Sequence, residues 1–270
     1  MSAESHYIPF KNSKIHYTLA GKGGEWLFCF HGYGENAALF GFLENSLEKD
    51  FTLVAIDFPF HGKTEWKEGL LFEPGLLVQL IQQIKPAHAK LSILGYSMGG
   101  RVALQLVQLI PESINKLLLI APDGLHSNQW QLFATQSSIG NYFFKRVMHN
   151  PALLLHTMDA LGKIGLYDQR LLKFVHFYLD DATERKRLYQ RWTTLRQFSV
   201  HQPLLQKLIA VHQIPLTLVF GKHDRVILSK HGWKFQQSAP GLIKVIEIEA
   251  GHQLLKEKQL PLIISLLRQP

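Results

Sequence analysis

The chain alternates short apolar runs with longer stretches of helical periodicity, and this alternation constrains its fold more than any other feature. Strands that alternate with helices favour a mostly parallel sheet with helices on both faces, because a parallel connection needs a crossover. Residues 6–20 are expected to form two strands joined by a polar turn at Asn12-Ser13. The other expected strands lie within residues 25–34, 51–62, 90–97, 115–124, 214–224 and 241–252. The sequence therefore predicts an α/β domain with a sheet of about eight strands.

Residues 125–211 break the alternation. They contain no convincing strand but several helical patterns, such as PALLLHTMDALGKI and TERKRLYQRWTTLRQF. A stretch of this length is too long to be a loop within a compact domain. We therefore predict a helical cap at 125–211, inserted over the strand ends of a core formed by residues 1–124 and 212–270.

Most of the positive charge of the chain falls in the predicted cap. The net charge is +8, and residues 125–211 hold 11 Lys and Arg against 5 Asp and Glu. An anionic small-molecule substrate is one interpretation of this charge, and the solvated faces of amphipathic helices are the other. No recognition motif accompanies the charge, so we expect no nucleic-acid partner. The sequence leaves open whether the protein is a monomer or a homodimer.

The expected location is the cytoplasm. The single cysteine, Cys29, cannot form an internal disulfide, which fits a reducing compartment. The first residues, MSAESHYIPFKNSKIHY, lack the apolar core of a secretory signal. The apolar runs are shorter than the roughly 18 residues needed to cross a bilayer, so we expect no membrane span.

Residues 91–106, LSILGYSMGGRVALQL, place the pattern G-x-S-x-G where an apolar run ends and a helical pattern begins. Chance supplies this pattern in such a chain with a probability of about 0.1, so the pattern alone is weak. Its place between a strand and a helix is the setting that a nucleophilic serine requires. Side chains at Gly95 and Gly99 would collide with the neighbouring strand and helix. We predict that Ser97 lies exposed on a sharp turn, at a helix N-terminus that stabilises negative charge.

A serine hydroxyl needs a base, and the base needs an acid that fixes its tautomer. His252, in EAGHQLL, follows the last strand and is the predicted base. Asp224, in VFGKHDRV, follows the preceding strand at the same sheet edge and is the predicted acid, with Asp123 as the alternative. His223 is interpreted as a bystander.

The predicted reaction also needs hydrogen-bond donors for a developing oxyanion. The backbone N–H of Met98, directly after the nucleophile, is one candidate. The second is the N–H of Tyr33 in FHGYGEN, where His31-Gly32 let the chain turn sharply. A second His-Gly pair occurs in FHGKT, but it does not follow the strand expected to carry this donor.

The segments HGYGEN, DFPFHG, LGYSMGGRVAL, FGKHD and AGH resemble the α/β-hydrolase-fold family, in the family's order Ser, Asp, His. The resemblance covers residues 6–124 and 212–270, and it implies a cap where residues 125–211 are inserted. Dehalogenases and epoxide hydrolases of this fold carry an aspartate at the position of Ser97. The chain has no zinc-type ligand spacing, P-loop or dinucleotide motif, so we expect no metal or cofactor. The fold hosts many chemistries and leaves the substrate open.

GYSMGGR is also similar to the corresponding segment of the menaquinone-pathway synthases that make 2-succinyl-6-hydroxy-2,4-cyclohexadiene-1-carboxylate. That family uses its triad to abstract a proton and eliminate pyruvate, and it binds carboxylates with arginines. Arg101 is the position that would carry over, and the alternative for Arg101 is a surface position or a structural ion pair. In the predicted cap, Arg191 and Trp192 are candidates for contact with an anionic substrate. The alternative places Trp192 on the inward face of an amphipathic helix with Leu188 and Leu195.

The first functional hypothesis is a serine hydrolase that cleaves a small carboxylic ester or related acyl compound through an acyl-enzyme. The second keeps the triad but makes the protein a lyase or a carbon–carbon bond hydrolase acting on a carboxylate. The third, more remote, is a ligand-binding module without enzymatic activity.

Overall fold

The computed structural model describes residues 3–126, 129–163 and 169–269, of which 129–131, 163, 169–171 and 173–174 are described by their backbone alone. Residues 127–128 and 164–168 of the predicted cap lie outside the described residues. In the part of the chain that is described, no helix is long and apolar enough to cross a membrane.

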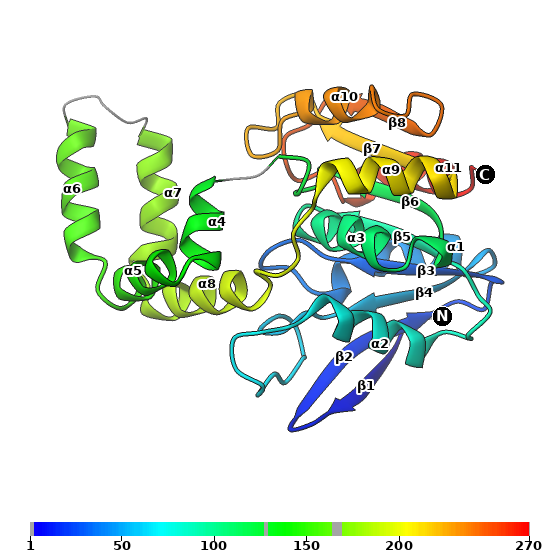
Figure 1. The fold of residues 1–270 in the computed structure, drawn as a ribbon, viewed down its shortest axis with the longest axis horizontal. Helices are drawn as coiled ribbons and strands as arrows, with labels where there is room; N and C mark the ends of the chain where they lie inside the picture. The colour runs from blue at the N-terminus through cyan, green and yellow to red at the C-terminus, as the bar shows by residue number, and fades with distance from the viewer. Residues whose placement is uncertain (1–2, 127–128, 164–168, 270) are drawn as a thin grey trace. The chain divides into compact units, whose positions relative to one another are not determined.

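The core of the fold is a single eight-stranded sheet in the order β1-β2-β4-β3-β5-β6-β7-β8 (Figure 1). The strands are β1 (Glu4–Phe10), β2 (Ser13–Ala20), β3 (Glu25–Phe30), β4 (Phe51–Ile56), β5 (Leu91–Tyr96), β6 (Ile114–Ile120), β7 (Leu216–Gly221) and β8 (Ile243–Ile248). Strands β3 to β8 run parallel to one another, while β2 pairs antiparallel with both β1 and β4. The predicted sheet of about eight mostly parallel strands is confirmed.

One turn differs from its prediction by a residue. Ser13 already belongs to β2 and pairs with Phe10, so the hairpin turns at Lys11 and Asn12 rather than at Asn12-Ser13. Lys11 adopts a φ of 50°, the left-handed conformation that lets two strands reverse within a short loop.

Helices cover both faces of the sheet, as the sequence predicts. Those of the core are α1 (Glu44–Leu47), α2 (Pro74–Ile84), α3 (Met98–Leu109), α9 (Gln202–His212), α10 (Lys230–Gln236) and α11 (Leu260–Leu267), with 3-10 turns η1 (Ala37–Leu43), η2 (Pro111–Ser113) and η3 (Glu257–Gln259). Helix α3 contacts α2 and α9 in one layer, whereas α11 contacts η1 in another. Strands β4 and β5 are buried along their whole length, because helices shield both faces of a parallel sheet.

Parallel order places the carboxyl ends of β3, β5, β7 and β8 at one edge of the sheet. The loops that follow these strands therefore lie at the same edge, which is where open α/β sheets bind ligands. The predicted nucleophile, base, acid and oxyanion donors lie in these loops or directly after one.

A second compact unit consists of residues 69–71 and 127–197, and its described part contains five helices. They are α4 (Gln129–Gln136), α5 (Ser138–His149), α6 (Ala152–Lys163), α7 (Gln169–Leu179) and α8 (Ala182–Thr194). Helix α5 contacts α4 and α8, and α7 contacts α6 and α8. At Gly140 a Cβ would lie 2.0 Å from the carbonyl oxygen of Phe133, so α4 and α5 approach too closely for a larger residue. Arg196 donates to the carbonyl oxygen of Leu70, which ties 69–71 to the end of α8.

The helical unit ends earlier than the predicted boundary at residue 211. Residues 198–211 belong to the core, because α9 packs on α3 and buries Leu205 and Ile209. Phe198 also stacks on Phe72 of the core, with ring centroids 5.9 Å apart. The sequence indicates that residues 202–212 are helical, but it does not show whether their apolar side chains pack on the core or on the other helices of the insertion.

Candidate active site

Ser97 occupies a strained turn between β5 and α3. Its backbone has φ 50° and ψ −114°, a conformation that costs a non-glycine residue about 1–3 kcal/mol. Three backbone hydrogen bonds hold it: Ser97 N donates to the Ile120 carbonyl at 3.0 Å, and its carbonyl accepts from Gly100 N and Asp123 N at 2.9 Å each. The strain is therefore offset by contacts with the end of β6 and the loop that follows it.

The glycines around Ser97 are required by close approach, as the sequence predicts. A Cβ on Gly99 would lie 1.9 Å from the carbonyl oxygen of Phe30 in β3. A Cβ on Gly95 would lie 2.8 Å from the carbonyl oxygen of Gly99 and 2.9 Å from Leu119 Cδ2. Real Cβ contacts are longer than these, so the turn can pass between the strands and α3 only with glycine at both positions.

Ser97, His252 and Asp224 form one continuous chain of hydrogen bonds. Ser97 Oγ lies 3.1 Å from His252 Nε2, and His252 Nδ1 lies 2.7 Å from Asp224 Oδ2. A carboxylate only accepts, so His252 Nδ1 carries the proton and Nε2 is left to accept from the Ser97 hydroxyl. The structure thus brings together the predicted nucleophile, base and acid, from the loops after β5, β8 and β7.

Asp224 is held as an ionised, fully buried acceptor. Its side chain is 0% exposed, and its Oδ1 accepts from Val226 N at 2.7 Å and Ile227 N at 3.0 Å. Burial alone raises the pKa of Asp224, but the hydrogen bonds from His252, Ile227 and Val226 outweigh burial and lower the pKa below its ordinary value. Asp224 therefore keeps a negative charge next to the His252 ring at neutral pH.

Tyr96 is a neighbour of this chain that sequence reasoning missed. Its hydroxyl donates to the His252 carbonyl at 3.2 Å, and the two rings lie 5.7 Å apart. Burial, together with the negative charges of Glu35 and Asp224, raises the pKa of Tyr96 to about 12, so Tyr96 stays a neutral donor. Tyr96 thereby fixes the loop that carries His252. The only feature of the sequence that points to Tyr96 is its position directly before Ser97.

The alternative acid, Asp123, lies beside Arg101. Asp123 Oδ2 is 3.5 Å from Arg101 Nε, with side chains 26% and 13% exposed. This is the structural ion pair that stood as the alternative for Arg101. His223 is paired with Glu249 on the surface, at 3.0 Å.

The loop after β3 lies against Ser97. A Cβ on Gly32 would be 3.4 Å from Ser97 Cβ and 3.0 Å from the Tyr96 ring. The Gly32 carbonyl accepts from Glu35 N at 3.3 Å and from His31 Nδ1 at 2.8 Å. This carbonyl and the Tyr33 N–H belong to one trans peptide and point in opposite directions, so holding the carbonyl also fixes the direction of the N–H.

His31 is a second residue whose role the sequence did not reveal. It is 0% exposed, and its Nε2 accepts from Phe58 N at 3.2 Å while Nδ1 contacts the Gly32 carbonyl. His31 therefore joins the loop after β3 to the loop after β4 as a neutral imidazole. The His-Gly pair was noted for its glycine, whereas the histidine carries the connection.

Arg191 and Trp192 lie on α8 within the helical unit. The Trp192 ring packs on Phe144 of α5, with centroids 5.7 Å apart. Leu188 on the same helix and Leu195 at its C-cap are buried, at 8% and 0% exposure. This arrangement is the inward-facing amphipathic helix that stood as the alternative for Trp192.

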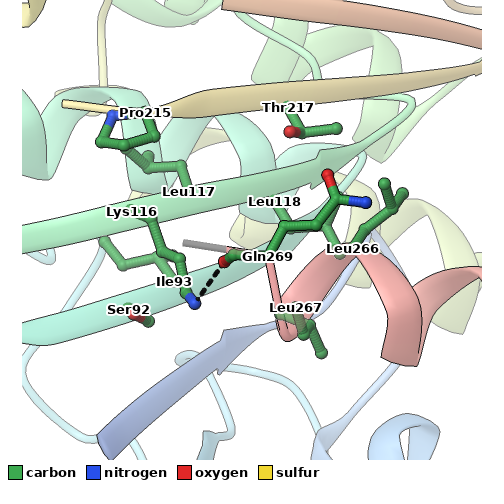
Figure 2. A pocket seen from close by; sticks show the side chains of 10 residues that line it. All are labelled: Ser92, Ile93, Lys116, Leu117, Leu118, Pro215, Thr217, Leu266, Leu267 and Gln269. Carbon is green, nitrogen blue, oxygen red and sulfur yellow. Dashed lines mark hydrogen bonds between the residues drawn. The ribbon is translucent and has the colours of Figure 1, made fainter. Parts of the chain in front are cut away.

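Figure 2 shows a pocket beside β5, β6 and β7, whereas Ser97 follows the carboxyl end of β5. Ser92 and Lys116, near the starts of β5 and β6, line it together with Gln269 after α11. Lys116 Nζ donates to the Gln269 carbonyl at 2.8 Å across this pocket. Its position separates it from the hydrogen-bonded chain. Among the described residues, no group of three or more His, Cys, Asp and Glu side chains is arranged to hold a metal.

A family model described as alpha/beta hydrolase fold matches residues 25–259. The chain belongs to the α/β-hydrolase family. Among curated proteins, it is 22% identical over 247 residues to the uncharacterized hydrolase YugF of Bacillus subtilis (strain 168), covering 90% of this chain and 88% of that protein. It is 28% identical over 244 residues to a pimeloyl-(acyl-carrier protein) methyl ester esterase of Nitrosomonas europaea, covering 89% and 93%.

Solved structures agree on the fold. The enol-lactonase from Burkholderia xenovorans LB400 superposes with a TM-score of 0.66 at 16% identity, over 98% of this chain and 100% of that one. The thioesterase domain from the curacin biosynthetic pathway gives a TM-score of 0.67 at 14% identity, over 100% of both chains. The predicted family and fold are confirmed, and the protein is a hydrolase of this family.

Proposed function

We propose that the protein is a serine hydrolase that cleaves a small carboxylic ester through an acyl-enzyme on Ser97. The observation that carries the proposal is the hydrogen-bonded chain Ser97–His252–Asp224, with heavy-atom distances of 3.1 and 2.7 Å. Both distances lie within or near the range expected between a nucleophile, its base and the group that orients the base. Two proteins to which the chain is similar are named as an esterase and an enol-lactonase.

In the proposed reaction, Ser97 Oγ attacks the ester carbonyl while its proton passes to His252 Nε2. Asp224 stabilises the imidazolium that forms and keeps its Nδ1–H directed at the carboxylate. His252 then gives the proton to the departing alcohol, which leaves an acyl group on Ser97. Water attacks the acyl-enzyme with His252 again as base, and the carboxylic acid departs as Ser97 recovers its proton.

Two backbone N–H groups are proposed to hold the oxyanion. Met98 is the first residue of α3, so its N–H has no partner within the helix and adds to the positive end of the helix dipole. The second is the Tyr33 N–H, whose direction follows from the fixed Gly32 carbonyl. Each such donor contributes about 3–4 kcal/mol of transition-state stabilisation in a comparable site.

The proposed substrate is an ester rather than a free carboxylate. Arg101, the residue that would bind a carboxylate in the alternative lyase reaction, is engaged with Asp123 at 3.5 Å. The proposed partner is a small acyl compound.

The test is a panel of aryl and alkyl esters of increasing acyl length, with Ser97→Ala as the matched blank. The proposal expects at least one ester to be hydrolysed, with kcat lowered by about 10⁶-fold in Ser97→Ala. Circular dichroism of the two proteins confirms equal folding. Ester turnover that survives in the variant, or a full panel without turnover above the blank, contradicts the proposal.

A further inference from the structure

A second Ser-His-Asp chain lies outside the candidate active site. Ser5 Oγ on β1 is 2.6 Å from His16 Nε2 on β2, and His16 Nδ1 is 2.7 Å from Oδ2 of Asp57, directly after β4. The order of atoms is the same as in Ser97–His252–Asp224. The proposed hydrolysis makes no use of these three residues.

The environment of Asp57 repeats that of Asp224. Asp57 is 1% exposed, its Oδ1 accepts from Ala37 N at 2.6 Å, and its Oδ2 accepts from Lys63 N at 2.7 Å. Each carboxylate thus accepts two backbone N–H groups and one imidazole. Asp57 only accepts when ionised, so His16 Nδ1 carries the proton and Nε2 accepts from the Ser5 hydroxyl.

Ser5 is an exposed residue, whereas its two partners are buried. Ser5 is exposed on β1, the edge strand of the sheet, whereas the side chains of His16 and Asp57 are 3% and 2% exposed. An electrophile that reaches this site therefore meets Ser5 first.

We propose that Ser5 is a second nucleophilic serine, which small activated acyl or phosphonyl compounds modify covalently. Ser5 Oγ attacks the electrophilic carbon or phosphorus, and its proton passes to His16 Nε2. The leaving group departs with the electron pair of its broken bond, as phenolate or fluoride, and His16 returns its proton to that anion or to water. Asp57 acts as a positioning residue that stabilises the protonated His16.

The site lacks the features that speed a full turnover. Ser5 lies in a regular strand instead of a strained turn at a helix N-terminus. Loss of a preorganised oxyanion donor slows reaction by about 10²–10³-fold. We therefore expect modification of Ser5 to be slower than that of Ser97 by about this factor.

The experiment uses the full-length Ser97→Ala protein with a fluorophosphonate probe, followed by tryptic mapping. Cleavage after Lys11 separates Ser5 from the Ser97 peptide, which runs from Leu91 to Arg101. The control serine is Ser199, which is exposed and whose Oγ bonds to no histidine among the described residues. General-base assistance predicts labelling of Ser5 about 10²-fold faster than that of Ser199.

Two further variants in the Ser97→Ala background separate activation from a purely structural tie between strands. Ser5→Ala removes the label while circular dichroism stays unchanged, because Ser5 is exposed. His16→Gln, if folded, retains the Ser5 hydroxyl but lowers its labelling to the rate of Ser199. If His16→Gln unfolds, the labelling rates of Ser5 and Ser199 in the Ser97→Ala protein decide the test alone. Labelling of Ser5 no faster than that of Ser199 overturns the proposal, and this result leaves the role of Ser97 untouched.

Discussion

Substitution of Asp224 by Asn tests the tautomer on which the proposed mechanism depends. Oδ1 of Asp224 accepts two backbone N–H groups, and Oδ2 accepts the His252 Nδ1 proton. An asparagine oxygen is expected in the Oδ1 position, because an NH₂ group there would face two donors. The amide NH₂ then faces His252 Nδ1, which must become an acceptor, so the proton moves to Nε2 and points at Ser97.

A His252 ring with its proton on Nε2 has no lone pair for the Ser97 hydroxyl. In a comparable triad this tautomer change lowers kcat by about 10⁴-fold with the geometry intact. At 1.36 kcal/mol for each factor of ten, the loss corresponds to about 5 kcal/mol of transition-state stabilisation. The substitution conserves volume, so the fold itself should persist.

The assay is kcat/KM on an activated ester at neutral pH, with Asp123→Asn as the matched control. Asp123 pairs with Arg101 and contacts Ser97 only through its backbone N–H, so its substitution should lower kcat/KM far less than that of Asp224. An Asp224→Asn variant within tenfold of the unsubstituted protein refutes the reasoning. A larger loss of kcat/KM in Asp123→Asn than in Asp224→Asn would mean that Asp123, and not Asp224, is the acid that orients His252.

Three further predictions concern stability. Gly99→Ala puts a Cβ 1.9 Å from the Phe30 carbonyl oxygen and should lower the free energy of unfolding by about 3 kcal/mol, measured by urea denaturation. The control is Gly241→Ala, which has no atom within 4 Å of its Cβ and should not lower the urea midpoint. Because hydrogen bonds lower the pKa of Asp224 below 3.8, its stabilisation is present above that pH and is lost as the pH falls through the folded-state pKa. Asp224→Asn should therefore flatten the acid limb of the plot of urea midpoint against pH, and an unchanged limb contradicts this. Hydrogen bonds to Asp159 and Asp180 raise the pKa of His176. The stabilisation that His176 gives to α6 and α7 is therefore present below pH 6.5 and is lost as the pH rises through the raised pKa. In His176→Gln, the hydrogen-exchange protection factors of these two helices should depend less on pH.

The sequence predicted the sheet and the hydrogen-bonded chain because both follow from local pattern and topology. Short apolar runs between helical stretches imply a parallel sheet, and the carboxyl ends of parallel strands meet at one edge. Ser97, Asp224 and His252 lie just beyond three such strands. Their approach follows once the strand order is known, although the sequence gives no distances.

The features that escaped prediction depend on contacts between distant segments. The assignment of α9 to the core rests on its packing against α3, nearly a hundred residues earlier in the chain. The partner of Arg101 in its ion pair was not predicted, because Asp123 lies in the loop after the next strand. The hydrogen-bonded chain from Ser5 to Asp57 requires the antiparallel pairing of β2 with β1 and with β4. The register of β1 and β2 depends on where the hairpin turns, and the prediction misplaced that turn by one residue.

The central claim, that Ser97 is the nucleophile of an acyl-transfer reaction, is tested most directly by rapid fluorophosphonate labelling with site mapping. The account predicts one fast adduct per chain, on Ser97 in the peptide from Leu91 to Arg101, which disappears in Ser97→Ala and is strongly slowed in Asp224→Asn. Loss of esterase activity should follow the same time course. A folded, active protein in which Ser97 stays unlabelled while activity is lost at another residue would contradict the account.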